Sequence, residues 1–347
     1  MTVTSASSSS PDSVAVLLLD GGLGTSLADD YGVRFGPHTP LWSSHLLIAD
    51  QTTLLACQRD FAEVPVDIIS TATYQVSLQG FANTVTSRFP NGIGRGDIIP
   101  FIRDAVRIAE DAAGSTGARV ALSLGPYGAC MVPSQEYSGR YDEQHDSVDA
   151  LRGWHVDCLG LFQEAGVFSS PVAGYVALET VPRVDEIVAL RQALDETRAV
   201  AFGTPFWISC LFPREEEGKE FTLPDGSSVK EAVAAMLDVS LRTLISSYER
   251  AVAELLAAEQ IDAAPPALIL YPDGTNGEVY NTSTQTWELP EGTGQRDISW
   301  ETQLAQIVRE TRSRGRWRQI VVGGCCKAGH RELGRLCREL QQQGLRG

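Results

Sequence analysis

Seven short apolar runs alternate with longer amphipathic stretches along this chain of 347 residues. Most of the runs stop at glycine, proline or polar residues, as buried strands do. The runs are Val14–Asp20, Val66–Tyr74, Val120–Gly125, Tyr175–Thr180, Phe206–Phe212, Ala267–Tyr271 and Gln319–Gly323. Apolar residues spaced by three and four predict helices over Thr52–Glu63, Ile98–Ala113, Val148–Ala165 and Val184–Thr197. This strand–helix alternation predicts a parallel sheet with crossover helices.

Polar residues follow the carboxyl ends of several predicted strands; they are Asp20, Tyr74, Glu179, Asp273 and the pair Cys325-Cys326. A (β/α)8 barrel builds its active site at that edge, and a doubly wound sheet binds its ligand there too. A doubly wound nucleotide-binding sheet would carry a glycine-rich phosphate loop. Asp20–Thr25 has the wrong glycine spacing for one, and Gly-Lys-Ser/Thr does not occur. The pattern therefore favours an α/β fold of the (β/α)8 TIM-barrel type.

The number of predicted strands is one short of eight. The gap lies between Phe212 and Ala267, where a polar loop, Pro213–Ser228, precedes a nearly unbroken helical pattern over Val229–Gln260. Two helices are expected to join near Asp238, where a barrel needs a strand. We therefore predict a barrel whose sixth strand is missing or disrupted.

Composition limits the classes of partner. The formal net charge is −16 and lysine and arginine are scattered, which argues against nucleic acid or an anionic membrane as a partner. No apolar stretch approaches the roughly 20 residues of a membrane span. The serine-rich segment Met1–Ser13 is expected to be a disordered tail, which leaves residues 14–347 as one domain. The seven irregularly spaced cysteines suit a reducing compartment, which predicts a cytoplasmic protein.

Cys325 and Cys326 are adjacent and follow an apolar run and two glycines, so both thiols are expected at one strand terminus. Neighbouring cysteines form a strained disulfide, because the bridge prefers Cα atoms roughly 5.5 Å apart. Two thiolates at one corner are better suited to a metal such as zinc. Zinc needs further ligands, which the pair itself does not supply.

Many short motifs follow one another between Leu17 and Cys326: Leu19-Asp20-Gly21-Gly22 with Gly24-Thr25, Pro40-Leu41-Trp42-Ser43, Thr71-Ala72-Thr73-Tyr74-Gln75, Ser123-Leu124-Gly125-Pro126-Tyr127-Gly128, Glu136-Tyr137 with Gly139, Leu178-Glu179-Thr180, Leu223-Pro224-Asp225-Gly226, Tyr271-Pro272-Asp273-Gly274 with Asn276-Gly277-Glu278, and Gly323-Gly324-Cys325-Cys326. With these motifs in this order, the chain resembles the zinc-dependent homocysteine S-methyltransferases, of the type that uses S-methylmethionine or S-adenosylmethionine.

The resemblance implies a barrel that transfers a methyl group from the donor to homocysteine and makes methionine, with Zn²⁺ as cofactor. Zinc binding deprotonates a thiol, so it can present homocysteine as the nucleophilic thiolate. Asp20 and Glu179 are expected to hold the amino group of homocysteine. Gly21 and Gly22 are expected to let the backbone approach the substrate.

The cationic donor needs an aromatic-lined site, for which Trp42, Tyr74 and Tyr127 are the candidates. Packing is the alternative role for each ring. Asp273 stands where the family commonly has asparagine, and a role in a turn is as well supported as a contact with ligand.

One family feature is missing. The family holds zinc with three cysteines, the third in a Val-Gly-x-Asn-Cys sequence at the end of the sixth strand, and this chain has no such sequence. Alternation along Phe206–Leu211 predicts that Ser209 faces the barrel and Cys210 the helices. Three explanations stay open: an incompletely assembled sequence, a non-catalytic barrel with an incomplete zinc site, or a third ligand rebuilt from Cys210, His330 or a carboxylate.

Overall fold

The computed structural model describes residues 14–36, 38–169, 173–197, 204–212, 221–229, 231–232, 235, 266–275, 278–281, 286–289 and 298–347. The predicted tail, Met1–Ser13, lies outside the described residues. So do the first half of the Pro213–Ser228 loop and almost all of Val229–Gln260, including the place where the sixth strand is expected. The tail and the missing or disrupted strand therefore stay predictions.

All seven predicted apolar runs form parallel strands: β1 (Ala15–Leu18), β2 (Ile68–Ser70), β3 (Arg119–Leu124), β4 (Ala173–Val181), β5 (Phe206–Cys210), β6 (Ala267–Leu270) and β9 (Gln319–Val322). Three strands form a sheet in the order β1-β9-β6, and four form a sheet in the order β2-β3-β4-β5. A parallel bridge between Leu19 and Ile68 joins the two sheets at β1 and β2. Neighbouring strands thus follow chain order from β5 back to β1, then continue through β9 to β6.

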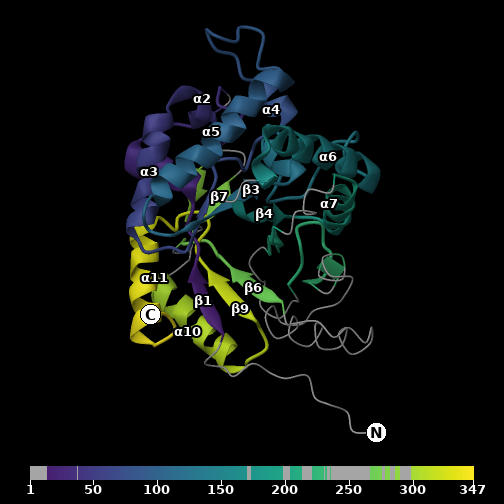
Figure 1. Cartoon of the computed structure of the whole chain (residues 1–347). Helices are drawn as coiled ribbons and strands as arrows, with labels where there is room; N and C mark the ends of the chain where they lie inside the picture. Colours follow the sequence, from purple (N-terminus) through teal and green to yellow (C-terminus); the bar gives the residue numbers. More distant parts are fainter. Residues whose placement is uncertain are drawn as a thin grey trace.

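The four predicted helices are present as α3 (Gln51–Glu63), α5 (Arg95–Ala113), α6 (Val148–Ala165) and α7 (Val184–Thr197). The remaining helical elements are α1 (Leu23–Tyr31), η2 (Trp42–His45), α2 (Leu46–Ala49), α4 (Leu78–Ala82), η3 (Tyr127–Cys130), η4 (Val167–Ser169), α10 (Trp300–Ser313) and α11 (His330–Gln342). A short antiparallel hairpin, β7 (Val279–Asn281) with β8 (Thr286–Glu288), follows β6. Figure 1 shows the strands at the centre and the helices around them.

A small apolar cluster lies on the inner face of the strands. All seven parallel strands, or the residues directly after them, contribute to it: Leu17, Leu19, Ile68, Ala121, Tyr175, Ala177, Trp207, Ile269, Tyr271 and Val321. Their other faces pack against the helices in a much larger cluster. One inner cluster shared by seven strands requires a strongly curved sheet. The α/β fold with parallel strands is therefore confirmed, and closure into a barrel stays a prediction.

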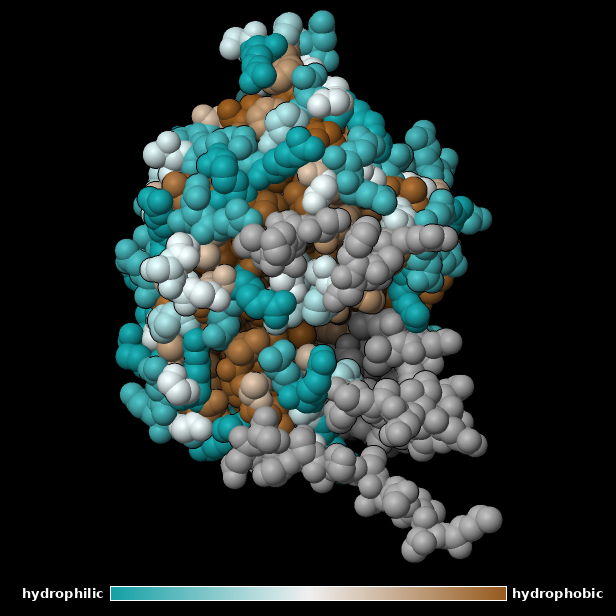
Figure 2. Space-filling view, in the orientation of Figure 1, coloured by the Kyte–Doolittle hydropathy of each residue, from teal (hydrophilic) through white to brown (hydrophobic). Residues whose placement is uncertain are grey.

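The surface seen in Figure 2 is mainly hydrophilic outside the grey residues, and apolar atoms show chiefly in its recesses. Among the helices of the described residues, none combines the length and the apolar character that a membrane crossing requires.

Candidate active site

The carboxyl ends of six of the seven parallel strands, all but β5, line one cavity of about 340 Å³. It is lined by Asp20 and Gly21 after β1, by residues after β2 and β3, by Glu179 and Thr180 of β4, by Tyr271 after β6 and by Cys325 and Cys326 after β9. Three non-glycine residues of the described chain have a positive φ, namely Trp42 (43°), Thr180 (59°) and Lys327 (60°). All three line this cavity. Strained backbone of this kind concentrates at functional sites.

Asp20 is held firmly on the cavity wall. It is only 4% exposed, and its carboxylate accepts hydrogen bonds from the backbone N–H of Ser70 at 2.7 Å and from the Ser70 hydroxyl at 2.9 Å. Burial, with a smaller contribution from nearby Glu179, raises the pKa of Asp20 to about 7 despite these bonds. A cation beside Asp20 would therefore favour its ionised form.

A backbone irregularity in β4 sets the direction of Glu179. The pairing of β4 with β5 shifts register between Leu178 and Val181, and Thr180 within that interval has a φ of 59°. Irregularities of this kind re-aim side chains next to active sites. Glu179 accepts hydrogen bonds from the hydroxyl groups of Ser123 and Tyr271, yet burial raises its pKa to about 7.

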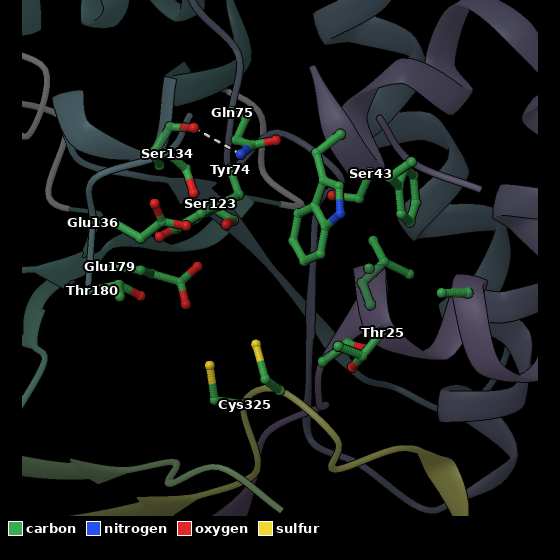
Figure 3. A pocket seen from close by; sticks show the side chains of 18 of the residues that line it. Thr25, Ser43, Tyr74, Gln75, Ser123, Ser134, Glu136, Glu179, Thr180 and Cys325 are labelled. Carbon is green, nitrogen blue, oxygen red and sulfur yellow. Dashed lines mark hydrogen bonds between the residues drawn. The ribbon is translucent and has the colours of Figure 1, made fainter. Parts of the chain in front are cut away.

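Glu136 adds a third carboxyl group to the wall. It is 8% exposed, and burial raises its pKa to about 7 although Ser134 donates a hydrogen bond to it. Burial raises the pKa of the Tyr74 hydroxyl well above its ordinary value, and the nearby Glu136, Cys325 and Glu179 add to this rise. In Figure 3, Glu136 and Glu179 lie on one side of the cavity and the Cys325 thiol points into it.

Two thiols and a carboxylate meet at the β6–β9 corner. Ligand atoms of Asp273, Cys325 and Cys326 all lie within 4.8 Å of one another, and no other such group of at least three occurs in the described part of the chain. Parallel pairing of β6 with β9 aligns Leu270 with Val322. The loops that follow then meet, because Cys325 donates its N–H to Pro272 and Gly274 donates to Cys326. The Tyr137 hydroxyl lies 3.4 Å from the Cys326 sulfur.

The other proposed third ligands lie elsewhere. Ser209 bonds the Tyr271 hydroxyl of the inner cluster, whereas Cys210 packs against the outer cluster, which confirms the predicted orientation of both. His330 begins α11, and its Nδ1 lies 3.8 Å from Asp30. Of the three groups weighed from the sequence, the structure brings only a carboxylate to the cysteine pair.

The aromatic candidates separate into two groups. Trp42 and Tyr74 line the cavity, and Trp42 also packs against Phe35 with ring centroids 5.4 Å apart. Tyr127 does not line the cavity among the described residues; it stacks on His145 at 4.1 Å and bonds Asp142. Tyr127 is therefore a packing residue.

Gly21 and Gly22 are needed for chain packing. A side chain on Gly21 would collide with the carbonyl oxygen of Ala328, and one on Gly22 with that of Cys325. Gly22 also donates its N–H to Ala328 at 3.1 Å. The two glycines thus bring the loop after β1 against the cysteine loop, and their predicted contact with substrate stays a prediction.

A buried carboxylate on α7 anchors the segment that carries Glu136 and Tyr137. Glu186 is fully buried and accepts a hydrogen bond from the backbone N–H of Tyr127 at 2.7 Å and another from the Tyr141 hydroxyl. Its Oε1 also lies 3.0 Å from His155 Nε2. The anchored segment runs across one wall of the cavity.

We expect Glu186→Ala to destabilise the fold by roughly 3 kcal/mol or more, because it leaves several buried polar groups without their partner. The measurement is urea unfolding. The control is Glu196→Ala on the same helix, which removes an exposed ion pair with Arg152 and should cost no more than about 1 kcal/mol. Equal losses for the two variants would contradict the anchoring role.

The sequence motifs included Glu136 and Tyr137 but predicted no role for either. For Asp273 they left two roles open, one in a turn and one in contact with ligand. Glu136 could have been singled out as an acidic residue in a segment rich in small and apolar residues. The sequence placed Asp273 at the same strand edge as the cysteines but did not identify it as the carboxylate beside them, since that contact depends on the pairing of two strands about 50 residues apart.

Comparison with known proteins decides the family. The family model described as "Homocysteine S-methyltransferase" matches residues 17–340. The chain belongs to this family. Homocysteine S-methyltransferase from Escherichia coli (strain K12) is 28% identical over 323 residues, covering 91% of this chain and 92% of the relative. Betaine-homocysteine S-methyltransferase from Drosophila melanogaster is 25% identical and covers 91% of both chains.

Solved structures agree on the fold. The chain is similar to the metallated form of the homocysteine methyltransferase MmuM from Escherichia coli, with a TM-score of 0.62 and 23% identity. The similarity covers 93% of this chain and 96% of that one. The resemblance stated from the sequence motifs is therefore confirmed at the level of family and fold.

Two of the chain's seven cysteines belong to the Asp273 group. All seven cysteines of the chain lie among the described residues, and five of them are outside the Asp273 group. No thiol is thus placed to act as a third zinc ligand beside Cys325 and Cys326. Tetrahedral zinc with Zn–S bonds of about 2.3 Å needs donors about 3.8 Å apart, so two thiolates and a carboxylate within 4.8 Å fit the ion.

Proposed function

We propose that this protein is a homocysteine S-methyltransferase that forms methionine from homocysteine and a sulfonium donor, either S-methylmethionine or S-adenosylmethionine. The observation that carries the proposal is the Asp273–Cys325–Cys326 group, because its two cysteines line the cavity that also holds Asp20 and Glu179. A thiol-rich metal site beside carboxylates suits an amino acid substrate that has its own thiol.

Zn²⁺ would be held by Cys325 and Cys326, with the Asp273 carboxylate in the place of the family's third cysteine. When bound, zinc supplies a Lewis acid that lowers the pKa of the homocysteine thiol. With these three protein ligands, the site would keep room for one atom of the substrate. The Tyr137 hydroxyl, 3.4 Å from the Cys326 sulfur, would orient that thiolate by a hydrogen bond.

Homocysteine would be held by its charged groups. Asp20 and Glu179 would bind the ammonium group, which restores the ionised form that burial disfavours in both. The first turn of α1, which begins at Leu23, lines the same cavity. Its backbone N–H groups lack helical partners and would bind the substrate carboxylate.

In the reaction, an electron pair of the homocysteine thiolate forms the new S–CH3 bond while the bond from that methyl carbon to the sulfonium sulfur breaks. The sulfonium sulfur keeps the pair of the broken bond and becomes a neutral thioether. The thiol proton is released. With S-methylmethionine both products are methionine. Trp42 and Tyr74 would face the sulfonium cation, at about 0.5–2 kcal/mol for each well-placed ring.

The remaining expectations belong to the same proposal. The strands would close into a (β/α)8 barrel with a missing or disrupted sixth strand, and residues 14–347 would form one domain. The protein would work in the cytoplasm without nucleic acid or membrane as a partner. The charge of −16 and the free cysteines support this environment.

The purified protein should contain close to one zinc per chain and should form methionine from homocysteine and S-methylmethionine. Zinc is measured by elemental analysis and methionine by chromatography. S-adenosylmethionine and betaine, tested in parallel, identify the donor. A folded protein without zinc or turnover would overturn the proposal and favour the non-catalytic barrel.

A further inference from the structure

We propose that Glu136 binds the α-ammonium group of the methyl donor, so that the donor is an α-amino-acid sulfonium and not a betaine. This inference rests on the proposed function and adds the recognition of the second substrate. Glu136 is then a specificity-determining residue for the donor, distinct from the two carboxylates proposed for homocysteine.

The first observation is an unpartnered oxygen. Glu136 is more than nine-tenths buried and lines the cavity, and its Oε2 has no hydrogen-bond partner among the described residues. Buried carboxylate oxygens normally have a partner, so a cavity-lining carboxyl group with one unpaired oxygen is short of a donor group. An ammonium group carries three N–H donors and a positive charge. It would donate a hydrogen bond to this carboxylate and also balance its negative charge.

The second observation is the charge of the cavity. Its described lining contains the carboxyl groups of Asp20, Asp29, Glu136 and Glu179. Lys327 is the only lysine or arginine in that lining, and its Nζ lies 2.8 Å from Asp29. Such a cavity favours a donor with a net positive charge. S-methylmethionine has one, from its sulfonium and ammonium groups against one carboxylate, whereas betaine has no net charge and its quaternary ammonium group carries no N–H donor.

The third observation is position. Glu136 directly precedes Tyr137, whose hydroxyl lies 3.4 Å from the Cys326 sulfur. Tyr74 lies within electrostatic reach of both Glu136 and Cys325. A donor bound at Glu136 therefore has the cysteine corner and the Tyr74 ring beside it. In S-methylmethionine three carbon atoms join the ammonium nitrogen to the sulfonium sulfur, so the methyl groups extend from Glu136 toward that corner.

The test compares two donors that differ only in the α-ammonium group. S-methylmethionine and its des-amino analogue, 4-(dimethylsulfonio)butanoate, are titrated by calorimetry into the zinc-loaded full-length protein and into Glu136→Gln, without homocysteine. We expect the unaltered protein to prefer S-methylmethionine by about tenfold to a hundredfold, the value of one charged hydrogen bond. Glu136→Gln should lose this preference while keeping its affinity for the analogue.

Glu143→Gln is the matched control, since Glu143 is exposed and seven residues further along the same segment. It should keep the preference for S-methylmethionine. An unchanged preference in Glu136→Gln, or no preference in the unaltered protein, overturns the inference. Homocysteine affinity, measured separately, should not change in Glu136→Gln. Failure of the proposed function would appear differently, as donor binding without methionine formation.

Discussion

Zinc affinity is expected to fall by more than a hundredfold in Cys326→Ala. It should also fall strongly in Asp273→Ala. Changes to residues that only support metal ligands already cost about 10- to 100-fold in affinity. Loss of one of three direct donors should cost more. The measurement is competition with a chromophoric zinc chelator, which reports on the metal independently of turnover.

Asp273 can be tested by exchange as well as by removal. Asp273→Cys would restore the three-thiolate set of the family and should bind zinc at least as tightly as the unaltered protein, because zinc accepts thiolate and carboxylate ligands alike. Asp273→Asn keeps an oxygen ligand but loses the negative charge. Its zinc affinity should therefore be intermediate between those of Asp273→Cys and Asp273→Ala.

Cys210→Ala is the control for the loss of a thiol. Cys210 packs toward the helices and is outside the Asp273 group, so zinc affinity should be unchanged. Loss of zinc from this variant would place Cys210 in the site. Unchanged affinity in Asp273→Ala would remove Asp273 from it.

The strands and their functional ends could be predicted from the sequence because burial and pairing leave strong local patterns. Every parallel strand comes from a continuous apolar run. Alternation along β5 was enough to place Ser209 inside and Cys210 outside. Asp20, Glu179 and the cysteine pair follow or end such strands. The sequence therefore predicts that they lie at one edge of the sheet, and in the structure they line one cavity.

Features that depend on contacts between distant segments could not be predicted in this way. Asp273 reaches the cysteines because β6 pairs with β9 and their loops exchange hydrogen bonds. Glu136 lies in an irregular segment whose course depends on Glu186, 50 residues further along the chain. No period of two or 3.6 residues exists there to indicate which side chain faces the cavity.

Glu179→Gln should abolish tight homocysteine binding and, at the same time, stabilise the ligand-free protein at alkaline pH. Glutamine cannot pair with the substrate ammonium as a carboxylate does, so the KM for homocysteine should rise by about tenfold to a hundredfold. Glutamine also carries no charge that burial would penalise. Its hydrogen bonds with the hydroxyl groups of Ser123 and Tyr271 can be kept, because hydroxyl groups both donate and accept.

The pH dependence follows from the pKa of Glu179, about 7 in the folded protein against an ordinary value of 4.5. Between these values the folded chain holds a proton that the unfolded chain has lost, so stability from the neutral carboxyl falls as pH rises through this window. Above pH 7 the buried charge destabilises the fold by at most about 3 kcal/mol. Glu179→Gln should therefore raise Tm by a few degrees at pH 8 and hardly at all near pH 4.5.

Asp20→Asn tests the same pair of effects on the second carboxyl group. Asparagine can accept the backbone N–H of Ser70 through its Oδ1 and donate its amide N–H to the Ser70 hydroxyl, because a hydroxyl group both donates and accepts. Burial raises the pKa of Asp20 to about 7, so we expect this variant to lose homocysteine binding and, like Glu179→Gln, to gain Tm at pH 8. Thermal melts at pH 5, 6.5 and 8, with homocysteine titrations at each pH, test both variants. A gain in Tm for Glu179→Gln that did not depend on pH would show that packing, and not a buried charge, accounts for it.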